Sequence, residues 1–243
     1  MKKVIFLALS IAVALQCAAQ FDSNPNQLVG LRSGINYHKM LLSYEGYKEY
    51  EQSMETGLSF GIYSRHRLMG NLHLRADAMY NHRATKMEWD DVKYSINAYY
   101  LDFRFPFQYI FRSDRMRAYP YIYAGPSLDI ATGGSISYTS TFTEELKESL
   151  SKNNYASFDI GILAGVGVQM PLNVSSMDCQ LSLEAGVDIG LMDTFSKKEL
   201  DGNVGVANPE LSNTNNHGTR KNLGFEVAVI LSIPLDRAFS RGY

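Results

Sequence analysis

The sequence predicts an all-β fold: an eight-stranded antiparallel transmembrane β-barrel with short periplasmic turns and long extracellular loops. Three observations support this prediction. The N-terminus carries an export signal, two-faced segments recur at period two along the rest of the chain, and the connections between them alternate between short and long. No later run of about 18 or more apolar residues predicts a membrane-spanning helix.

Residues 1–19 have the pattern of a secretory signal peptide. Two lysines precede an apolar run, and small residues at its end favour cleavage after Ala19. Cys17 raises the alternative of a lipoprotein, but the residues before it are too large for that processing. The barrel domain is therefore expected over residues 20–243, exported by a cleaved signal peptide to the outer membrane of a Gram-negative bacterium.

Removal of the signal peptide changes the charge and the cysteine content. Two lysines leave and no acid does, so the formal net charge goes from −2 for the full chain to −4 for the mature chain. This acidic balance disfavours nucleic acid as a partner. Cys179 remains as the sole cysteine, so an intramolecular disulfide is excluded, although an exported compartment would permit one.

Eight segments of the mature chain alternate apolar and polar residues. The connections near Arg67, Asp114 and Asn173 are short, whereas the others run from about 11 to nearly 30 residues, as expected for periplasmic turns and outer loops. The segments span residues 27–38, 55–65, 71–82, 94–111, 118–131, 156–170, 179–192 and 221–235, with ends placed to within about 2 to 4 residues.

The fourth segment shows the two faces most clearly. Over residues 99–111, bulky apolar residues alternate with a second set that includes Asp102 and Arg104, and the run exceeds the roughly 5 to 6 residues usual in a soluble strand. Its continuous apolar face suits contact with lipid. Pro106 in this segment and Pro126 in the next cannot donate to a strand ladder, so we expect bulges or local breaks at both.

A soluble barrel would turn its apolar face inward, so the polar face decides between the two architectures. That face carries glycines such as Gly61, Gly165 and Gly167, which weaken a strand and gain nothing on an exposed surface. They fit the crowded lumen of an eight-stranded barrel, which is filled by side chains. Charges share this face, and we expect a lumen lined with paired charges from Arg32, Arg75, Asp77, Asp102, Arg104, Asp129, Asp159, Glu184, Asp188 and Glu226.

Aromatic residues support a membrane location. The chain has 16 Tyr and 12 Phe, and aromatic girdles mark the two interfaces of a membrane barrel. Those near the ends of the predicted strands are Tyr37, Tyr80, Tyr99, Tyr109, Phe111, Tyr119 and Phe225.

Several stretches of the chain carry a family resemblance. They are YLDFRFP at residues 100–106, PYIYAGPS at residues 120–127, DIG at residues 159–161 and AGVGV at residues 164–168. Together they resemble the Bacteroidetes outer-membrane β-barrel proteins often called PorT-like, over nearly the whole mature chain. The resemblance implies a barrel without a catalytic residue, with proline usual in the corresponding strands. The founding member of that family assists type IX secretion, and most relatives have no known role.

We expect neither a catalytic site, nor a cofactor, nor a metal. An enzyme at the outer rim would need a histidine beside a carboxylate, and His82 with Asp90 and Asp91 is the best candidate group, although the sequence does not fix its geometry. The histidines lack close ligand spacing and Cys179 stands alone, which disfavours a metal site.

The long loops and the turns differ in character. Residues 141–152 combine a capping box with Leu146 and Leu150 at helical spacing, which predicts a short helix. The loop over residues 193–220 is rich in Asn, Gly, Ser and Thr, which favours a surface segment. Arginines that could meet anionic envelope partners gather around the predicted periplasmic turns and tail: Arg65, Arg67, Arg112, Arg115, Arg117, Arg237 and Arg241.

The predicted role is that of a non-enzymatic envelope structural or interaction protein whose loops carry specificity, with a PorT-like part in protein secretion as its narrower form. Three alternatives stay open: a small-solute channel, a hydrolase or acyltransferase at the rim, and a soluble secreted barrel that binds an apolar ligand. Expected partners are outer-membrane lipid and envelope or secretion-system proteins. The sequence does not indicate the oligomeric state.

Overall fold

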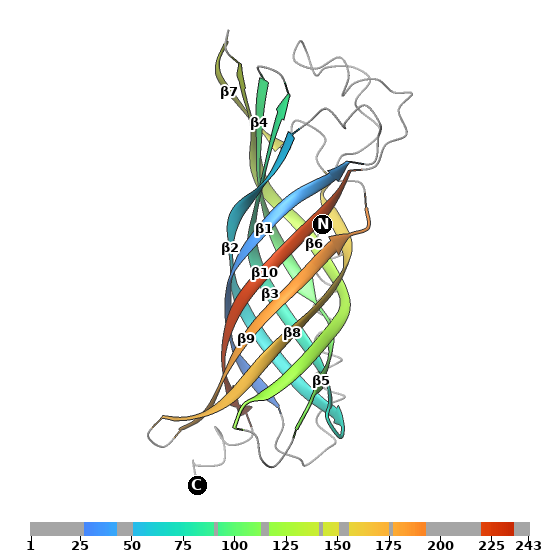
Figure 1. The fold of residues 1–243 in the computed structure, drawn as a ribbon, viewed down its shortest axis with the longest axis vertical. Helices are drawn as coiled ribbons and strands as arrows, with labels where there is room; N and C mark the ends of the chain where they lie inside the picture. The colour runs from blue at the N-terminus through green and yellow to red at the C-terminus, as the bar shows by residue number, and fades with distance from the viewer. Residues whose placement is uncertain are drawn as a thin grey trace.

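The computed structural model describes residues 27–42, 51–89, 92–112, 117–140, 143–150, 156–174, 177–192 and 220–235. The predicted signal peptide and Cys17 lie outside these ranges. The strands are β1 (Leu28–Leu42), β2 (Glu51–Met69), β3 (Leu72–Trp89), β4 (Val92–Arg104), β5 (Phe107–Ile110), β6 (Tyr119–Ser140), β7 (Thr143–Ser149), β8 (Phe158–Val174), β9 (Met177–Gly190) and β10 (Arg220–Pro234) (Figure 1). No helix in the described ranges is long and apolar enough to cross a membrane.

The strands form one antiparallel sheet that closes on itself. Pairing runs β1–β2, β2–β3, β3–β4, β4–β6, β6–β8, β8–β9 and β9–β10, and β10 returns to β1. The short β5 continues β4 along the wall, since it also lies between β3 and β6. Eight strands therefore make the wall, as predicted, and closure gives every wall strand two partners, as hydrocarbon requires.

The two ends of the barrel differ (Figure 1). One end, which we call the turn end, carries the turn between β2 and β3, where Gly70 has a φ of 50° that favours glycine. At the opposite end β2, β3, β4 and β6 continue after β1 and β8 have stopped pairing with them, and β7 adds to β6. We call this five-stranded sheet the extension; it comprises residues 51–54, 85–89, 92–98, 134–140 and 143–149.

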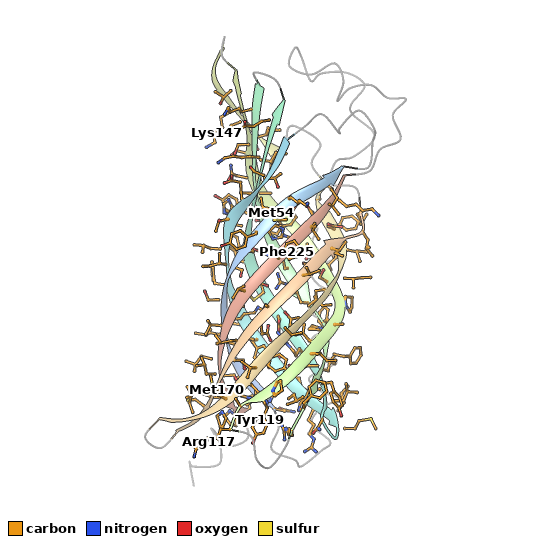
Figure 2. All side chains as sticks on the ribbon, in the orientation of Figure 1. Met54, Arg117, Tyr119, Lys147, Met170 and Phe225 are labelled. Carbon is orange, nitrogen blue, oxygen red and sulfur yellow. The ribbon has the colours of Figure 1, made fainter. Side chains whose placement is uncertain are left out.

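The wall presents large apolar side chains on its outer surface (Figure 2). Leu31, Leu58 and Phe60 are 60 to 68% exposed, and Ile62 and Val166 are comparable. Exposed apolar residues on this scale mark a surface that another apolar phase covers. With polar side chains buried inside, this pattern matches a barrel in lipid rather than a soluble barrel with an apolar interior.

Two expectations for the long connections are wrong. Residues 143–149 form β7 instead of a helix, because pairing with β6 satisfies backbone groups that so short a helix would leave to water. The connection after the third predicted segment is short, since β3 and β4 continue as a hairpin to Trp89 and Val92. The continued parts of these strands have a polar outer face. They therefore lack the apolar alternation that marks a lipid-facing strand, and the sequence pattern did not predict them.

The two prolines behave differently. Pro106 lies in a break between β4 and β5, where its carbonyl accepts a hydrogen bond from Arg75 N at 2.9 Å, as expected. Pro126 lies within an uninterrupted β6, so the expected break there is wrong; its carbonyl accepts from Phe105 N at 3.0 Å. Gly125 makes this approach feasible, because a Cβ at that position would lie 2.5 Å from Pro106 Cα.

Candidate functional site

Inward-facing charges form a network that starts in the half of the lumen nearer the turn end. Arg75 Nη1 lies 2.6 Å from Glu184 Oε1, and Arg75 Nη2 lies 2.7 Å from Asp77 Oδ2. Arg32 forms an ion pair with the same Glu184, and the Tyr121 hydroxyl donates to it at 2.7 Å. All five side chains are buried. These side chains come from β1, β3, β6 and β9, which are not neighbours in the wall, so they meet across the lumen from inward-facing positions.

Aromatic rings hold the guanidinium of Arg75 in place. Its central carbon lies 5.0 Å from the ring centroid of Tyr63 and 4.8 Å from that of Tyr123. Tyr123 needs glycine opposite it, since a Cβ at Gly165 would lie 2.5 Å from the Tyr123 hydroxyl oxygen. The glycines on the polar face thus make room for large lumen side chains.

Glu226 joins the two halves of the network. Its Oε2 accepts from Arg32 Nη2 at 2.9 Å and also from Arg104, while Ser59 donates to its other oxygen. Arg104 in turn lies 3.3 Å from Asp102. A single chain of charge-assisted hydrogen bonds therefore runs along much of the lumen.

Arg83 is the centre of the half nearer the extension, and the sequence analysis did not include it. Its Nη2 lies 2.9 Å from Asp102, 2.7 Å from Asp129 and 3.7 Å from Asp188, and its guanidinium stacks on Tyr100 at 4.4 Å. The predicted third strand stopped at residue 82, directly before Arg83, whereas β3 continues to Trp89. Continuing the inward parity of Arg75 and Asp77 along β3 would have identified Arg83.

Asp159 is the one residue of the predicted lumen charge network that the structure places apart from the arginines. It is buried, and it accepts from Met192 N and from Asn222 Nδ2, each at 3.0 Å. Within the described residues it pairs with neutral groups. It therefore fixes the ends of β9 and β10 beside β8 rather than joining the charge network.

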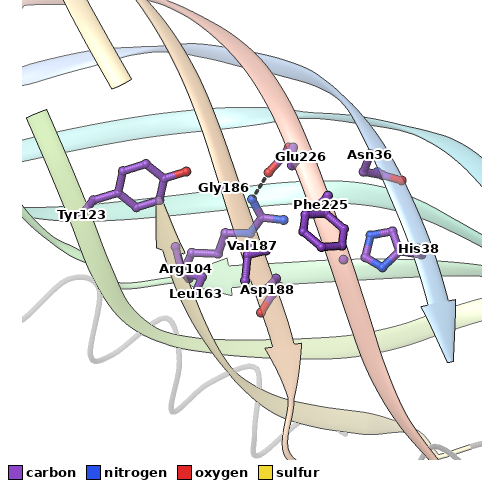
Figure 3. A pocket seen from close by; sticks show the side chains of 11 residues that line it. Asn36, His38, Arg104, Tyr123, Leu163, Gly186, Val187, Asp188, Phe225 and Glu226 are labelled. Carbon is purple, nitrogen blue, oxygen red and sulfur yellow. Dashed lines mark hydrogen bonds and ion pairs between the residues drawn. The ribbon is translucent and has the colours of Figure 1, made fainter. Parts of the chain in front are cut away.

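The lumen contains a small cavity beside Arg104. Its volume is about 20 Å³, and it is lined among others by Asn36, His38, Asp188 and Glu226 (Figure 3). That volume accommodates about one water molecule. Beside Arg104 the lumen therefore has room for little more than a water molecule.

His82, the candidate rim base, lies on the outer surface of the wall. Its ring stacks on Tyr99 at 5.0 Å, and its Nε2 lies 3.2 Å from Asn97 Oδ1. Asp90 and Asp91 lie outside the described residues. Among the residues that the structure describes, there is no group of three or more His, Cys, Asp or Glu placed to hold a metal ion.

The extension reverses the polarity of the wall. Along β4, the inward positions change from Asp102 and Arg104 in the wall to Ile96 and Ala98 in the extension, where both are buried. Ile136 pairs with Ile96 and is buried as well. The outward positions of β4 change from apolar residues to Asn97, Ser95 and the exposed Lys93. Between β4 and β6, the extension therefore makes apolar contacts inside and presents Lys93 to water outside.

Two β-bulges mark the boundary between wall and extension. One lies in β2 between Met54 and Ser59, and the other lies in β6 opposite the step from Tyr99 to Tyr100. They flank the β3–β4 pair on both sides and lie near the same level. Because a bulge bends and twists its strand, this pair of bulges lets the extension leave the barrel wall. The stacked rings of Tyr80, Tyr99 and His82 lie at this level, where an aromatic girdle is expected.

Comparison with known proteins identifies a family. A family model described as outer membrane protein beta-barrel domain matches residues 18–196, more than half of the chain. Similar solved structures include Neisserial surface protein A (12% identity, TM-score 0.42, 86% of this chain and 97% of that one). OprG from Pseudomonas aeruginosa (10%, 0.44, 85% and 93%) and Ail of Yersinia pestis (10%, 0.36, 85% and 98%) are also similar. No curated protein gives a significant match.

Proposed function

Since the chain belongs to the family of outer membrane protein β-barrel domains, we propose that it is a non-enzymatic, non-conducting anchor that presents the extension to a protein partner outside the cell. One observation carries this proposal: the wall strands continue past the lipid-facing surface into a sheet of opposite polarity. A barrel needs no such continuation to cross a membrane. Recognition is a role that would use it.

The edge of the extension suggests the kind of partner. Among the described strands, β7 pairs with β6 alone, so its second edge is available to an extended segment of another protein. Lys147 on β7 and Lys93 on β4 are exposed (Figure 2 labels Lys147). Charged side chains of this kind limit indiscriminate pairing at an edge and favour a selected partner.

Site-specific photo-crosslinking in living cells tests this proposal. Probes at Lys93 and Lys147 should capture the same protein, and a probe at the lipid-facing Phe60 should capture none. Replacing residues 135–153 by a short turn removes Lys147 but retains Lys93, and it should leave a heat-modifiable barrel in the membrane while abolishing the capture by the probe at Lys93. Equal capture with and without the β6–β7 hairpin would contradict recognition by the extension.

A part in protein secretion, which the PorT-like resemblance implies, is the narrower form of this role and would place recognition at the turn end. Probes at the exposed Arg112 and Arg117 distinguish the two forms. Capture of a secretion-system protein there, with none at Lys93 or Lys147, would favour the secretion role.

Conductance measurements test the alternative that the protein is a small-solute channel. The packed network predicts that purified protein shows no steady conductance in planar bilayers. Large, steady conductance would contradict the anchor role and favour the channel alternative.

A further inference from the structure

The two halves of the charge network differ in how arginines balance carboxylates. In the half nearer the turn end, Arg32 and Arg75 lie beside two acids, Asp77 and Glu184. The half nearer the extension has two arginines for four acids within the described residues: Arg83 and Arg104, with Asp102, Asp129, Asp188 and Glu226. A buried carboxylate without a balancing charge is costly, and such a group takes up a proton instead.

The excess of negative charge falls on Asp129 and Asp188. Asp102 lies near a second arginine, Arg104, at 3.3 Å. Among the described residues, Arg83 is the only arginine within 4 Å of Asp129 or Asp188. Its Nη2 carries two hydrogens, and these go to Asp102 at 2.9 Å and to Asp129 at 2.7 Å. Asp188 Oδ2, at 3.7 Å, is therefore left without a hydrogen-bond donor.

A glycine lets Asp188 reach towards Asp129. Asp188 lies on β9 and Asp129 lies on β6, with β8 between them. At Gly161 of β8, a Cβ would lie 2.9 Å from Asp188 Oδ1 and 2.5 Å from the Ser127 hydroxyl oxygen. Because that Cβ is missing, the Asp188 carboxylate crosses β8 and accepts a hydrogen bond from Ser127 at 3.2 Å. Ser127 is two residues from Asp129, on the same face of β6.

We propose that Asp129 and Asp188 form a proton-binding site, in which the two carboxyl groups share one proton at neutral pH. The proton comes from the solvent, removes one negative charge and supplies the donor that Asp188 Oδ2 lacks. Two acids that share a site hold a proton for this reason. Asp188 also lines the small cavity beside Arg104, where a water molecule can exchange the proton (Figure 3).

The other groups around the site favour a carboxyl as the place of this proton. Asp159 lies opposite Asp129 in the strand register, and it already accepts two hydrogen bonds from neutral donors. His38 lines the same cavity with its Nδ1 unpartnered, so a proton on its ring is the competing arrangement. That proton would sit where Arg104 already supplies a cation, away from the excess charge. The charged and titratable groups that face the site are His38 of β1, Arg83 of β3, Asp102 and Arg104 of β4, Asp159 of β8 and Glu226 of β10.

Infrared spectroscopy on the folded barrel in a neutral detergent tests the site. At neutral pH the wild type should show the carbonyl band of a buried, protonated carboxyl group. Asp129→Asn and Asp188→Asn should each abolish this band, because the single carboxylate that remains is balanced by Arg83. Asp77→Asn is the matched control: it removes a buried aspartate that already has arginines within 4 Å, so the band should persist.

The pH dependence of urea unfolding is the second measurement. Aspartates of the unfolded chain are ionised at neutral pH, so folding takes up the shared proton and rising pH opposes it. From about pH 6 to about pH 8, each pH unit should lower the folding equilibrium constant of the wild type by about tenfold relative to Asp129→Asn.

Two results would overturn the site. One is a wild type without the carboxyl band, as expected if a proton on His38 or a bound sodium ion balances the charge. The other is a band that persists in both Asp129→Asn and Asp188→Asn. If one of these variants fails to fold, the wild-type spectrum and the other variant still decide.

Discussion

The wall and the extension are made by the same strands, yet they obey opposite rules. In the wall of β4, Asp102 and Arg104 are buried and apolar residues face outward. A few residues further along the strand, Ile96 and Ala98 are buried while Lys93 is exposed. The strand period is unchanged, so the surrounding solvent determines which face is apolar. We therefore expect the edge of the membrane at the level where the polarity reverses.

The largest expected effect comes from breaking the network of the wall. Arg75→Leu leaves Asp77 with only the more distant Arg32, 3.8 Å away, and removes one of the two arginines on Glu184, so we expect a loss of about 3 to 5 kcal/mol in the free energy of unfolding. Reversible urea unfolding in lipid vesicles measures it. Arg117→Leu, at an exposed position, serves as the control and should change stability little. Equal losses for the two variants would show that the network does not stabilise the wall.

The next effect tests the outer surface of the wall against that of the extension. Phe60→Arg places a charge in lipid and should cost about 2 to 4 kcal/mol if residue 60 lies near the midplane of the bilayer. Ser95→Arg, at a half-buried position on the outward side of the extension, should cost much less because water rather than lipid can reach the new charge. The same urea titration compares them. A matching cost at both positions would contradict the proposed membrane boundary.

The strands of the wall could be predicted from the sequence because contact with lipid imposes a simple pattern of residues. An apolar outer face and a polar inner face alternate for the full thickness of a bilayer, so the eight segments and the inward parity of Arg75 or Glu184 could be predicted. Parity also predicts which charges face the lumen, but it cannot assign partners. That Arg83 contacts three carboxylates depends on the register between β3, β4, β6 and β9.

The extension was harder to predict for a physical reason. Its outer face is polar, so the lipid pattern ends where the extension begins and the remaining residues resemble loops. The bulges in β2 and β6 then shift the parity by one, which breaks the alternation that identifies a strand. Residues 143–149 illustrate the outcome: their local spacing favours a helix, whereas pairing with β6 makes them a strand.

A smaller effect concerns the inner face of the extension. Ile96→Val removes one methylene from a buried apolar contact between β4 and β6 and should cost about 0.5 to 1.5 kcal/mol. The loss should be local, so amide hydrogen exchange should speed up in the β6–β7 hairpin and stay unchanged in β8 and β9. Faster exchange throughout the wall would show that the two regions unfold together.

The smallest effect is expected on the outer face of the extension. Lys86 Nζ lies 3.0 Å from Glu55 Oε1, but the lysine side chain is half exposed, so water and salt screen the pair. Lys86→Gln should therefore change the free energy of unfolding by at most about 1 kcal/mol, and the change should fade at high salt. Arg75→Leu, whose ion pairs are shielded from solvent, should keep its full cost at the same salt concentration. Comparing how salt changes the cost of each substitution shows how differently water reaches the two regions. If salt changed both costs equally, the Lys86–Glu55 pair would be as shielded from solvent as the ion pairs of Arg75.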